Sequence, residues 1–297
     1  MKYDISELQA FFRQGRNITE LLRSEEGVPT NSVTSILYSY DMQAGSYTEL
    51  MKDPCYAAHK AQVGAKLAAV LDELSPDSIL DAGIGEATTV TSLLAAMSHK
   101  PAKLFGFDLS LSRLLFARRN LEASGGHDAE LFCGGLENVA LSDGAVDVVL
   151  TVHALEPNYG REEEILTELL RVAGRALVLV EPCWELGSAA TRARMERHRY
   201  VQGMPDILRR LGYPASRVEK WHLDVNPENE AALIVVDKGV RSTTRAAQFI
   251  SPISRKPLVR RTDCWFCPED GHAFPIISGI PCLTTESAIL ASKLTMF

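Results

Sequence analysis

The stretch that decides the fold runs from residue 79 to residue 90 and reads ILDAGIGEATTV. An apolar run, typical of a buried strand, ends at Asp81, and Gly83 and Gly85 then allow a tight turn in which the backbone can approach a ligand. A dinucleotide-binding fingerprint would have a third glycine, but Thr88 stands at that position. The pattern therefore predicts a strand, a ligand-binding turn and a helix, in this order.

Two acidic side chains flank this turn. Asp81 lies two residues before the first glycine, and Asp108 is the last residue of the next predicted strand. A carboxylate at the first position would repel a pyrophosphate but attract an amine. One at the second position can accept hydrogen bonds from both hydroxyls of a ribose. The pair favours a nucleoside that carries a cationic amino-acid portion and no phosphates.

The segments around the turn alternate between apolar runs of strand length and helical patterns. Strands are predicted over residues 78–81, 103–108, 130–133, 146–152 and 176–180, and helices over residues 56–74, 88–97, 110–123 and 161–173. A helix over residues 195–211 is then followed by two strands, over residues 218–224 and 231–236, which we expect to pair antiparallel at a sheet edge. This order predicts an α/β fold with a doubly wound, mostly parallel sheet.

These motifs, in this order, resemble the class I S-adenosylmethionine-dependent methyltransferase family over residues 56–238. The family's first motif corresponds to Asp81, Gly83 and Gly85, and its ribose-binding acid to Asp108. Its adenine-binding segment corresponds to GGLENVALSDGAVDVV, residues 134–149. The resemblance implies a Rossmann-like, seven-stranded sheet with S-adenosylmethionine as cofactor and S-adenosylhomocysteine as product. The cofactor-binding residues that it implies are Tyr40, Tyr47, Asp81, Ala82, Gly83, Gly85, Asp108, Leu109, Gly135, Leu136 and Thr151.

One position departs from the family's pattern. Gly135 stands where many relatives carry an aspartate, so a side-chain contact to the adenine amino group is not expected there. A contact through the backbone of Leu136 remains open. The alternative interpretation is another Rossmann-like binding protein, which a lone GxG would fit equally well.

Residues 151–158 read TVHALEPN and follow the fourth predicted strand. Side chains there should face the transferred methyl group, because ligands of such sheets lie at the carboxyl ends of the strands. Methyltransferases that act on the amino groups of bases or glutamine carry an Asp/Asn-Pro-Pro-aromatic motif here, and its absence disfavours those substrates. His153 is a candidate base for a hydroxyl or amine, or it orients Glu156. Glu181, after the fifth strand, is a second catalytic candidate, or else a helix-capping or substrate-orienting acid.

Residues 1–55 are predicted to form an N-terminal helical lid. Apolar residues at helical spacing cover residues 5–22, and YSYDMQAGSY, residues 38–47, is similar to the lid of many small-molecule methyltransferases. On one helix Tyr40 and Tyr47 would share a face. They would then attract a sulfonium by cation–π contact, or else anchor the lid to the core. The basic stretch RARMERHRY, residues 192–200, either also closes the pocket or is a solvated helix.

Residues 241–297 are predicted to form a small β-rich module after a methyltransferase domain over residues 56–240. The stretch FPIISGIPCL, residues 274–283, resembles the zinc-ribbon-like activator subunits of tRNA, rRNA and release-factor methyltransferases. Serines replace the first cysteine pair of that pattern, and a structural zinc needs four ligands. We therefore expect no metal, the alternative being a zinc site. The serines that stand in place of the first cysteine pair are Ser251 and Ser254. The alternative zinc site would use Cys264, Cys267, His272 and Cys282 as its four ligands.

The composition excludes several classes of protein. The chain has 297 residues, of which 46% are hydrophobic and 23% charged, as in ordinary globular proteins. No stretch approaches the ~18 apolar residues of a membrane span, and no signal peptide is recognised. Because the cysteines are scattered, we expect a reducing, cytoplasmic location. Because no membrane span is predicted, we expect no membrane partner. The net charge of −7 disfavours nucleic acid, although residues 241–297 carry 7 Lys and Arg against 4 Asp and Glu.

The residues together predict an enzyme that transfers a methyl group to an oxygen or nitrogen of a small-molecule metabolite. The transfer is an in-line displacement in which positioning and desolvation supply much of the rate, so a base is not strictly required. One alternative is an RNA methyltransferase that uses the basic module for recognition. Another is a non-catalytic scaffold, which the intact glycine turn and its two acids disfavour. Pairing of strands in the tail leaves a homodimer open.

Overall fold

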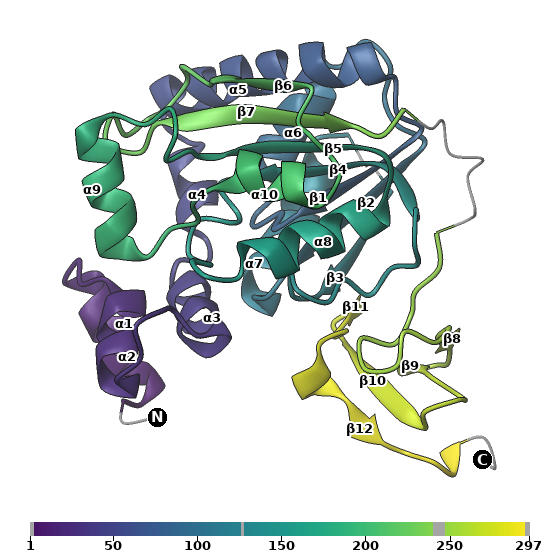
Figure 1. Cartoon of the computed structure of the whole chain (residues 1–297). Helices are drawn as coiled ribbons and strands as arrows, with labels where there is room; N and C mark the ends of the chain where they lie inside the picture. The colour runs from purple at the N-terminus through teal and green to yellow at the C-terminus, as the bar shows by residue number, and fades with distance from the viewer. Residues whose placement is uncertain (1–2, 126–127, 240–246, 295–297) are drawn as a thin grey trace.

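The computed structural model describes residues 3–125, 128–239 and 247–294. Its centre is a seven-stranded sheet of order β3-β2-β1-β4-β5-β7-β6 (Figure 1). β7 runs antiparallel to both of its neighbours, and the other pairs are parallel. This arrangement confirms the predicted α/β fold with its antiparallel edge pair. The strands are β1 (Ser78–Ala82), β2 (Lys103–Asp108), β3 (Ala129–Cys133), β4 (Val146–Val152), β5 (Ala173–Pro182), β6 (Arg217–Lys220) and β7 (Ala231–Asp237).

Helices cover both faces of this sheet, so the central strands are buried along almost their whole length. One apolar core joins one face to α5 (Pro54–Leu74), α6 (Thr88–Ala96) and α7 (Leu111–Ala123). A second core joins the other face to α8 (Glu162–Val172) and α10 (Met204–Arg210). In the part of the chain that the structure describes, no helix is both long and apolar enough to cross a membrane.

The single helix predicted over residues 195–211 is wrong. The segment forms two helices, α9 (Ala189–His198) and α10, because Arg199 and Gly203 adopt left-handed backbone conformations with φ of 58° and 69°. A left-handed residue ends a helix, since it turns the chain away from the helical path. The strand predicted over residues 218–224 is likewise shorter in the structure, where β6 ends at Lys220.

The N-terminal lid consists of four short helices, α1 (Ile5–Arg13), α2 (Ile18–Glu26), α3 (Val33–Met42) and α4 (Ser46–Leu50). The continuous helix predicted over residues 5–22 is wrong, because Gly15 takes a φ of 75° between α1 and α2. The first two helices enclose a small core of their own around Leu8, Ile18 and Leu22. Figure 1 shows this helical group beside α9.

Tyr40 and Tyr47 do not share one helix. Gly45 has a φ of 93° and separates α3 from α4. The Cα of Gly45 packs so closely on the Phe116 ring that a Cβ atom would lie 2.8 Å from it, so this turn requires glycine. The prediction of a shared helical face is therefore wrong.

The C-terminal module is a small antiparallel sheet of order β11-β10-β9-β8, with β12 paired to β10. Its strands are β8 (Val259–Arg260), β9 (Cys264–Phe266), β10 (His272–Ile277), β11 (Ile280–Pro281) and β12 (Ile289–Leu290). The module lies against the β3 edge of the main sheet (Figure 1), where the Leu283 amide donates to the Cys133 carbonyl at 2.9 Å. The Phe249 ring packs between Phe132 and Trp265. The predicted boundary after residue 240 lies outside the described residues.

Candidate active site

A cavity of about 550 Å³ opens at the carboxyl ends of β1, β2 and β4. Ligands of open α/β sheets bind at this edge. The lid helices, the loop after β4, α9 and the turn before β7 supply the other walls. Among the predicted site residues, the cavity is lined by Tyr40, Tyr47, Gly83, Asp108, Leu109, Leu136 and His153. Asp81, Ala82, Gly85, Gly135, Thr151 and Glu181 are not among its described lining residues.

The glycine turn follows β1 as the sequence predicts. The amides of Gly83 and Ile84 both donate to the Phe107 carbonyl at 2.9 Å, which ties the turn to β2. Gly83 and Gly85 have φ of 81° and 56°. A Cβ atom on Gly83 would lie 2.5 Å from Ala154, and one on Gly85 would lie 2.4 Å from Arg113. A larger residue at either position would displace Ala154 or Arg113, both of which line the cavity.

A buried pair of opposite charges lies beside this turn. Burial, and to a lesser degree Asp108, raises the pKa of Asp81 to about 7, although Lys60 opposes the shift. Burial lowers the pKa of Lys60 to about 8, and its Nζ donates to Thr89 Oγ1 at 2.8 Å. An ammonium and a carboxylate so placed match the two charged groups of an amino acid. Lys60 is not predicted from the sequence, because nothing within α5 distinguishes this lysine.

Asp108 organises the second motif. Its two carboxylate oxygens accept from the amides of Gly85 at 3.1 Å and Ser110 at 2.9 Å. The Arg113 guanidinium lies 3.6 Å from the carboxylate and 5.4 Å from the ring centres of both Tyr40 and Tyr47. The two tyrosines thus surround a cation, although they come from different helices.

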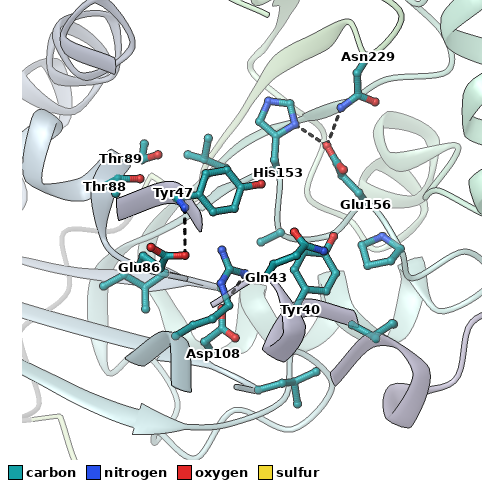
Figure 2. Close-up of a pocket in the computed structure, with 18 of the residues that line it drawn as sticks. Tyr40, Gln43, Tyr47, Glu86, Thr88, Thr89, Asp108, His153, Glu156 and Asn229 are labelled. Carbon is teal, nitrogen blue, oxygen red and sulfur yellow. Dashed lines mark hydrogen bonds and ion pairs between the residues drawn. The ribbon is translucent and has the colours of Figure 1, made fainter. Parts of the chain in front are cut away.

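Glu86, within the glycine stretch, holds the lid against the cavity. Its carboxylate accepts from the amides of Gly45 at 3.0 Å, Tyr47 at 3.3 Å and Thr48 at 2.7 Å (Figure 2). The Thr48 hydroxyl donates to it as well, at 2.5 Å. The lid is therefore attached to the same turn that shapes the cavity floor. The sequence offers no signal for this role, which depends on where α4 packs.

The segment predicted to hold adenine follows β3. Gly134, Leu136 and Glu137 line the cavity, and the Gly134 amide donates to the Asp108 carbonyl at 3.1 Å. The C-terminal module supports this segment from behind, since the Ile250 amide donates to the Ala140 carbonyl at 3.1 Å. A backbone contact through Leu136 therefore stays a prediction that the geometry permits.

His153 and Glu156 form a hydrogen-bonded pair at the other end of the cavity. Nδ1 of His153 lies 2.5 Å from Glu156 Oε1, and the Asn229 amide donates to the same oxygen at 2.9 Å (Figure 2). Burial lowers the pKa of His153, but the charge and hydrogen bond of Glu156 outweigh it, so the pKa is raised overall. His153 also adopts a left-handed conformation with φ of 54°, which directs its side chain from the end of β4. Its second ring nitrogen is left for a ligand.

Glu181 acts behind the cavity wall. It is fully buried, and its carboxylate accepts from the amides of Ala154 at 2.9 Å and Leu155 at 3.2 Å. Burial raises its pKa to about 7. Glu181 does not line the cavity and instead shapes the loop that carries His153 and Glu156, while its catalytic, helix-capping and substrate-orienting roles stay predictions.

The basic stretch at residues 192–200 contributes to the cavity rather than only facing water. Arg194 and Tyr200 line it, together with Arg161 and Asn229. α9 is held in this place by the lid, because the Asn31 amide donates to the carbonyls of Pro157 at 2.9 Å and His198 at 3.1 Å. The sequence analysis left the stretch as either a solvated helix or part of the closure, and it did not single out Arg194.

The two serines of the module, which stand where the activator-subunit pattern has cysteines, form a hydrogen-bonded cluster. The Ser251 and Ser254 hydroxyls donate to one oxygen of Asp270 at 2.7 and 2.5 Å, and Cys267 Sγ lies 3.8 Å from Ser254 Oγ. Cys264 lies on β9, apart from this cluster. Within the described residues, no group of three or more His, Cys, Asp or Glu side chains could hold a metal.

Comparison with known proteins places this site in a recognised fold. Residues 79–175 match the family model of the methyltransferase domain. These residues resemble a methyltransferase domain. It is similar to magnesium protoporphyrin IX methyltransferase from Synechocystis PCC 6803 with bound S-adenosylhomocysteine, at 14% identity and a TM-score of 0.53, over 69% of this chain and 99% of that one. It is also similar to an O-methyltransferase named as putative from Nostoc punctiforme PCC 73102, at 14% identity and a TM-score of 0.50, over 67% and 60% of the two chains. These identities establish a common fold.

Proposed function

We propose that the protein is an S-adenosylmethionine-dependent methyltransferase that methylates a hydroxyl group of a small molecule. The observation that carries the proposal is a single cavity with two chemically different ends. One end is lined by Gly83 of the glycine turn, Lys60 and Asp108, with the buried Asp81 near the end of β1, and the other presents the His153–Glu156 pair. Methyltransferases of this fold use S-adenosylmethionine as methyl donor, and the residues of the first end fit that molecule.

The fit can be followed group by group. Asp81 would attract the ammonium of the methionine portion, and Lys60 its carboxylate. Asp108 would accept hydrogen bonds from the ribose hydroxyls. The glycine turn would approach the nucleoside through its backbone, since Ala154 and Arg113 leave no room for side chains at Gly83 and Gly85. Leu136 would contact the adenine through its backbone.

The chemistry of the second end follows from His153. When bound, S-adenosylmethionine supplies a methyl group on a sulfonium, so the acceptor oxygen bonds to the methyl carbon while the carbon–sulfur bond breaks and its electron pair stays on sulfur. His153 takes the hydroxyl proton on the ring nitrogen that Glu156 leaves open, and Glu156 stabilises the resulting imidazolium. Glu181 and the lid contribute by orienting the loop and excluding water. A hydroxyl fits this base better than a neutral amine, which attacks through its lone pair and loses its proton only after the transfer.

The cavity favours a small acceptor over RNA. Its volume of about 550 Å³ must hold both the nucleoside and the acceptor. Two cations of the basic module are already paired within the protein, Arg255 with Glu168 at 3.0 Å and Lys256 with Glu269 at 3.3 Å. These pairings weaken the argument for the module as an RNA-binding surface.

The test is to incubate the protein with S-adenosylmethionine labelled on its methyl group and with a fractionated cell extract. We expect label in the small-molecule fraction, and less of it with the His153→Asn variant. Label in RNA or protein instead would contradict the small-molecule acceptor. Micromolar binding of S-adenosylmethionine without transfer to any fraction would support a non-catalytic scaffold.

A further inference from the structure

A cation without an ion pair lies in the wall at the acceptor end of the cavity, although the Glu156 charge acts on it and Tyr200 shares a hydrogen bond with it. Arg194, on α9, lines the cavity, and no carboxylate of the described residues lies within ion-pair distance of it. Its Nε is buried and has no hydrogen-bond partner among those residues. A neighbouring cation behaves differently, since Arg161 pairs with Glu137 at 3.4 Å and with Glu164 at 3.3 Å. A buried charged donor without a partner is costly unless a ligand satisfies it.

A second unsatisfied atom lies at the same end. Asn229 donates its amide nitrogen to Glu156 at 2.9 Å, which sets the orientation of the amide group. Its Oδ1 is buried and accepts no hydrogen bond within the described part of the chain. The wall around His153 therefore presents three complementary groups: a base, a free acceptor oxygen and a free cationic donor.

We propose that the methyl acceptor is a small hydroxylated acid whose anionic group, a carboxylate or a phosphate, is bound by Arg194. A hydroxyl or amine of the same molecule donates to Asn229 Oδ1, and the hydroxyl that is methylated donates to His153. This inference rests on the proposed methyl transfer and adds the charge class of its substrate. A neutral apolar acceptor would leave Arg194 Nε and Asn229 Oδ1 without hydrogen-bond partners, which disfavours it.

The experiment separates a small-molecule cell extract on an anion exchanger before the reaction. The retained and unretained fractions are then each incubated with the protein and methyl-labelled S-adenosylmethionine. We expect the label to enter molecules of the retained fraction. At limiting extract, Arg194→Gln should lower this labelling about tenfold to a hundredfold, the loss of a charged hydrogen bond. Arg194→Lys, which keeps the charge, should retain more.

Two controls separate recognition from folding. Arg197→Gln removes an exposed arginine from the same helix and should label like the unchanged protein. Calorimetric affinity for S-adenosylmethionine should be equal in all variants, since Arg194 lies at the acceptor end. Label only from the unretained fraction, or undiminished labelling by Arg194→Gln, would overturn the anionic acceptor alone. Label from neither fraction, with the cofactor still bound, would contradict the methyl transfer itself.

Discussion

The two ends of the cavity are built in different ways. The proposed cofactor end comes from consecutive segments of the sheet, where Asp81 and Asp108 lie near the carboxyl ends of β1 and β2 and Gly83 follows β1. The acceptor end is assembled from the loop after β4, from α9 and from the turn before β7, which meet only in the folded chain. Under the proposed function, binding of the nucleoside would be a property of the fold, whereas the choice of acceptor would belong to this chain. Single substitutions should therefore change either the affinity for S-adenosylmethionine or the reaction with the acceptor, but not both.

The largest expected effect is at the cofactor end. Asp108→Ala should weaken S-adenosylmethionine binding by a hundredfold or more, the loss of roughly two hydrogen bonds to a charged group. Isothermal titration calorimetry measures this directly. Asp206→Ala, which removes an exposed aspartate with 63% of its side chain accessible, is the matched control. An unchanged affinity in Asp108→Ala would refute its assignment to the ribose.

The second effect should appear at the acceptor end alone. His153→Asn keeps a residue that tolerates the left-handed backbone but removes the base. We expect kcat to fall about 10²- to 10⁴-fold, with the affinity for S-adenosylmethionine unchanged. His99→Ala, at an exposed histidine, should leave both quantities alone. A parallel loss of cofactor affinity in His153→Asn would contradict the proposal that His153 acts at the acceptor end alone.

Lys60→Met tests the cofactor end at a residue that no motif marks. Loss of the ammonium should weaken S-adenosylmethionine binding about tenfold. Because the pKa of Lys60 is about 8, the cation is present below that pH and lost above it, so affinity should fall as the pH rises through 8. This fall should be absent in Lys60→Met and present in the exposed Lys52→Met. Equal pH curves for both variants would argue against a carboxylate contact.

The pH profile sharpens the role of Glu156. His153 acts as a base only when neutral, so kcat/KM should decline as the pH falls below its pKa, which lies above the ordinary value because Glu156 outweighs burial. Glu156→Gln removes that charge, and the acid limb should move to lower pH while the plateau falls about tenfold. A purely structural role would lower activity without moving the limb.

The smallest effect should come from outside both ends. Ser254→Ala removes a hydrogen bond to Asp270 in the module and should lower the free energy of unfolding by about 1 kcal/mol. Cofactor affinity and kcat should not change. Chelation of metals should not change the thermal midpoint of the unchanged protein or of Ser254→Ala. A large drop of the midpoint on chelation would indicate that the cluster holds a metal.

Prediction from the sequence succeeded where a local pattern is sufficient. The strand, turn and helix around Gly83 are specified by neighbours in the chain, and the buried strands by their continuous apolar runs. It failed at Gly45 and Gly203, where left-handed turns break the expected helices. Glycine inside a helical pattern was the available signal at these positions. Lys60 and Asn229 carried no local signal, and Arg194 was marked only as part of the basic stretch at residues 192–200.

The sequence by itself determined the α/β order of the main sheet, the glycine turn and the placement of Asp81 and Asp108 at the ends of the first two strands. These features depend on periodicity and on backbone freedom, which act over a few residues. Only the tertiary structure decided that Glu86 holds the lid, that Glu156 pairs with His153 beside Asn229, and that Arg194 reaches the cavity. Such contacts join segments far apart in the chain, and the packing of whole helices and loops determines which side chains meet.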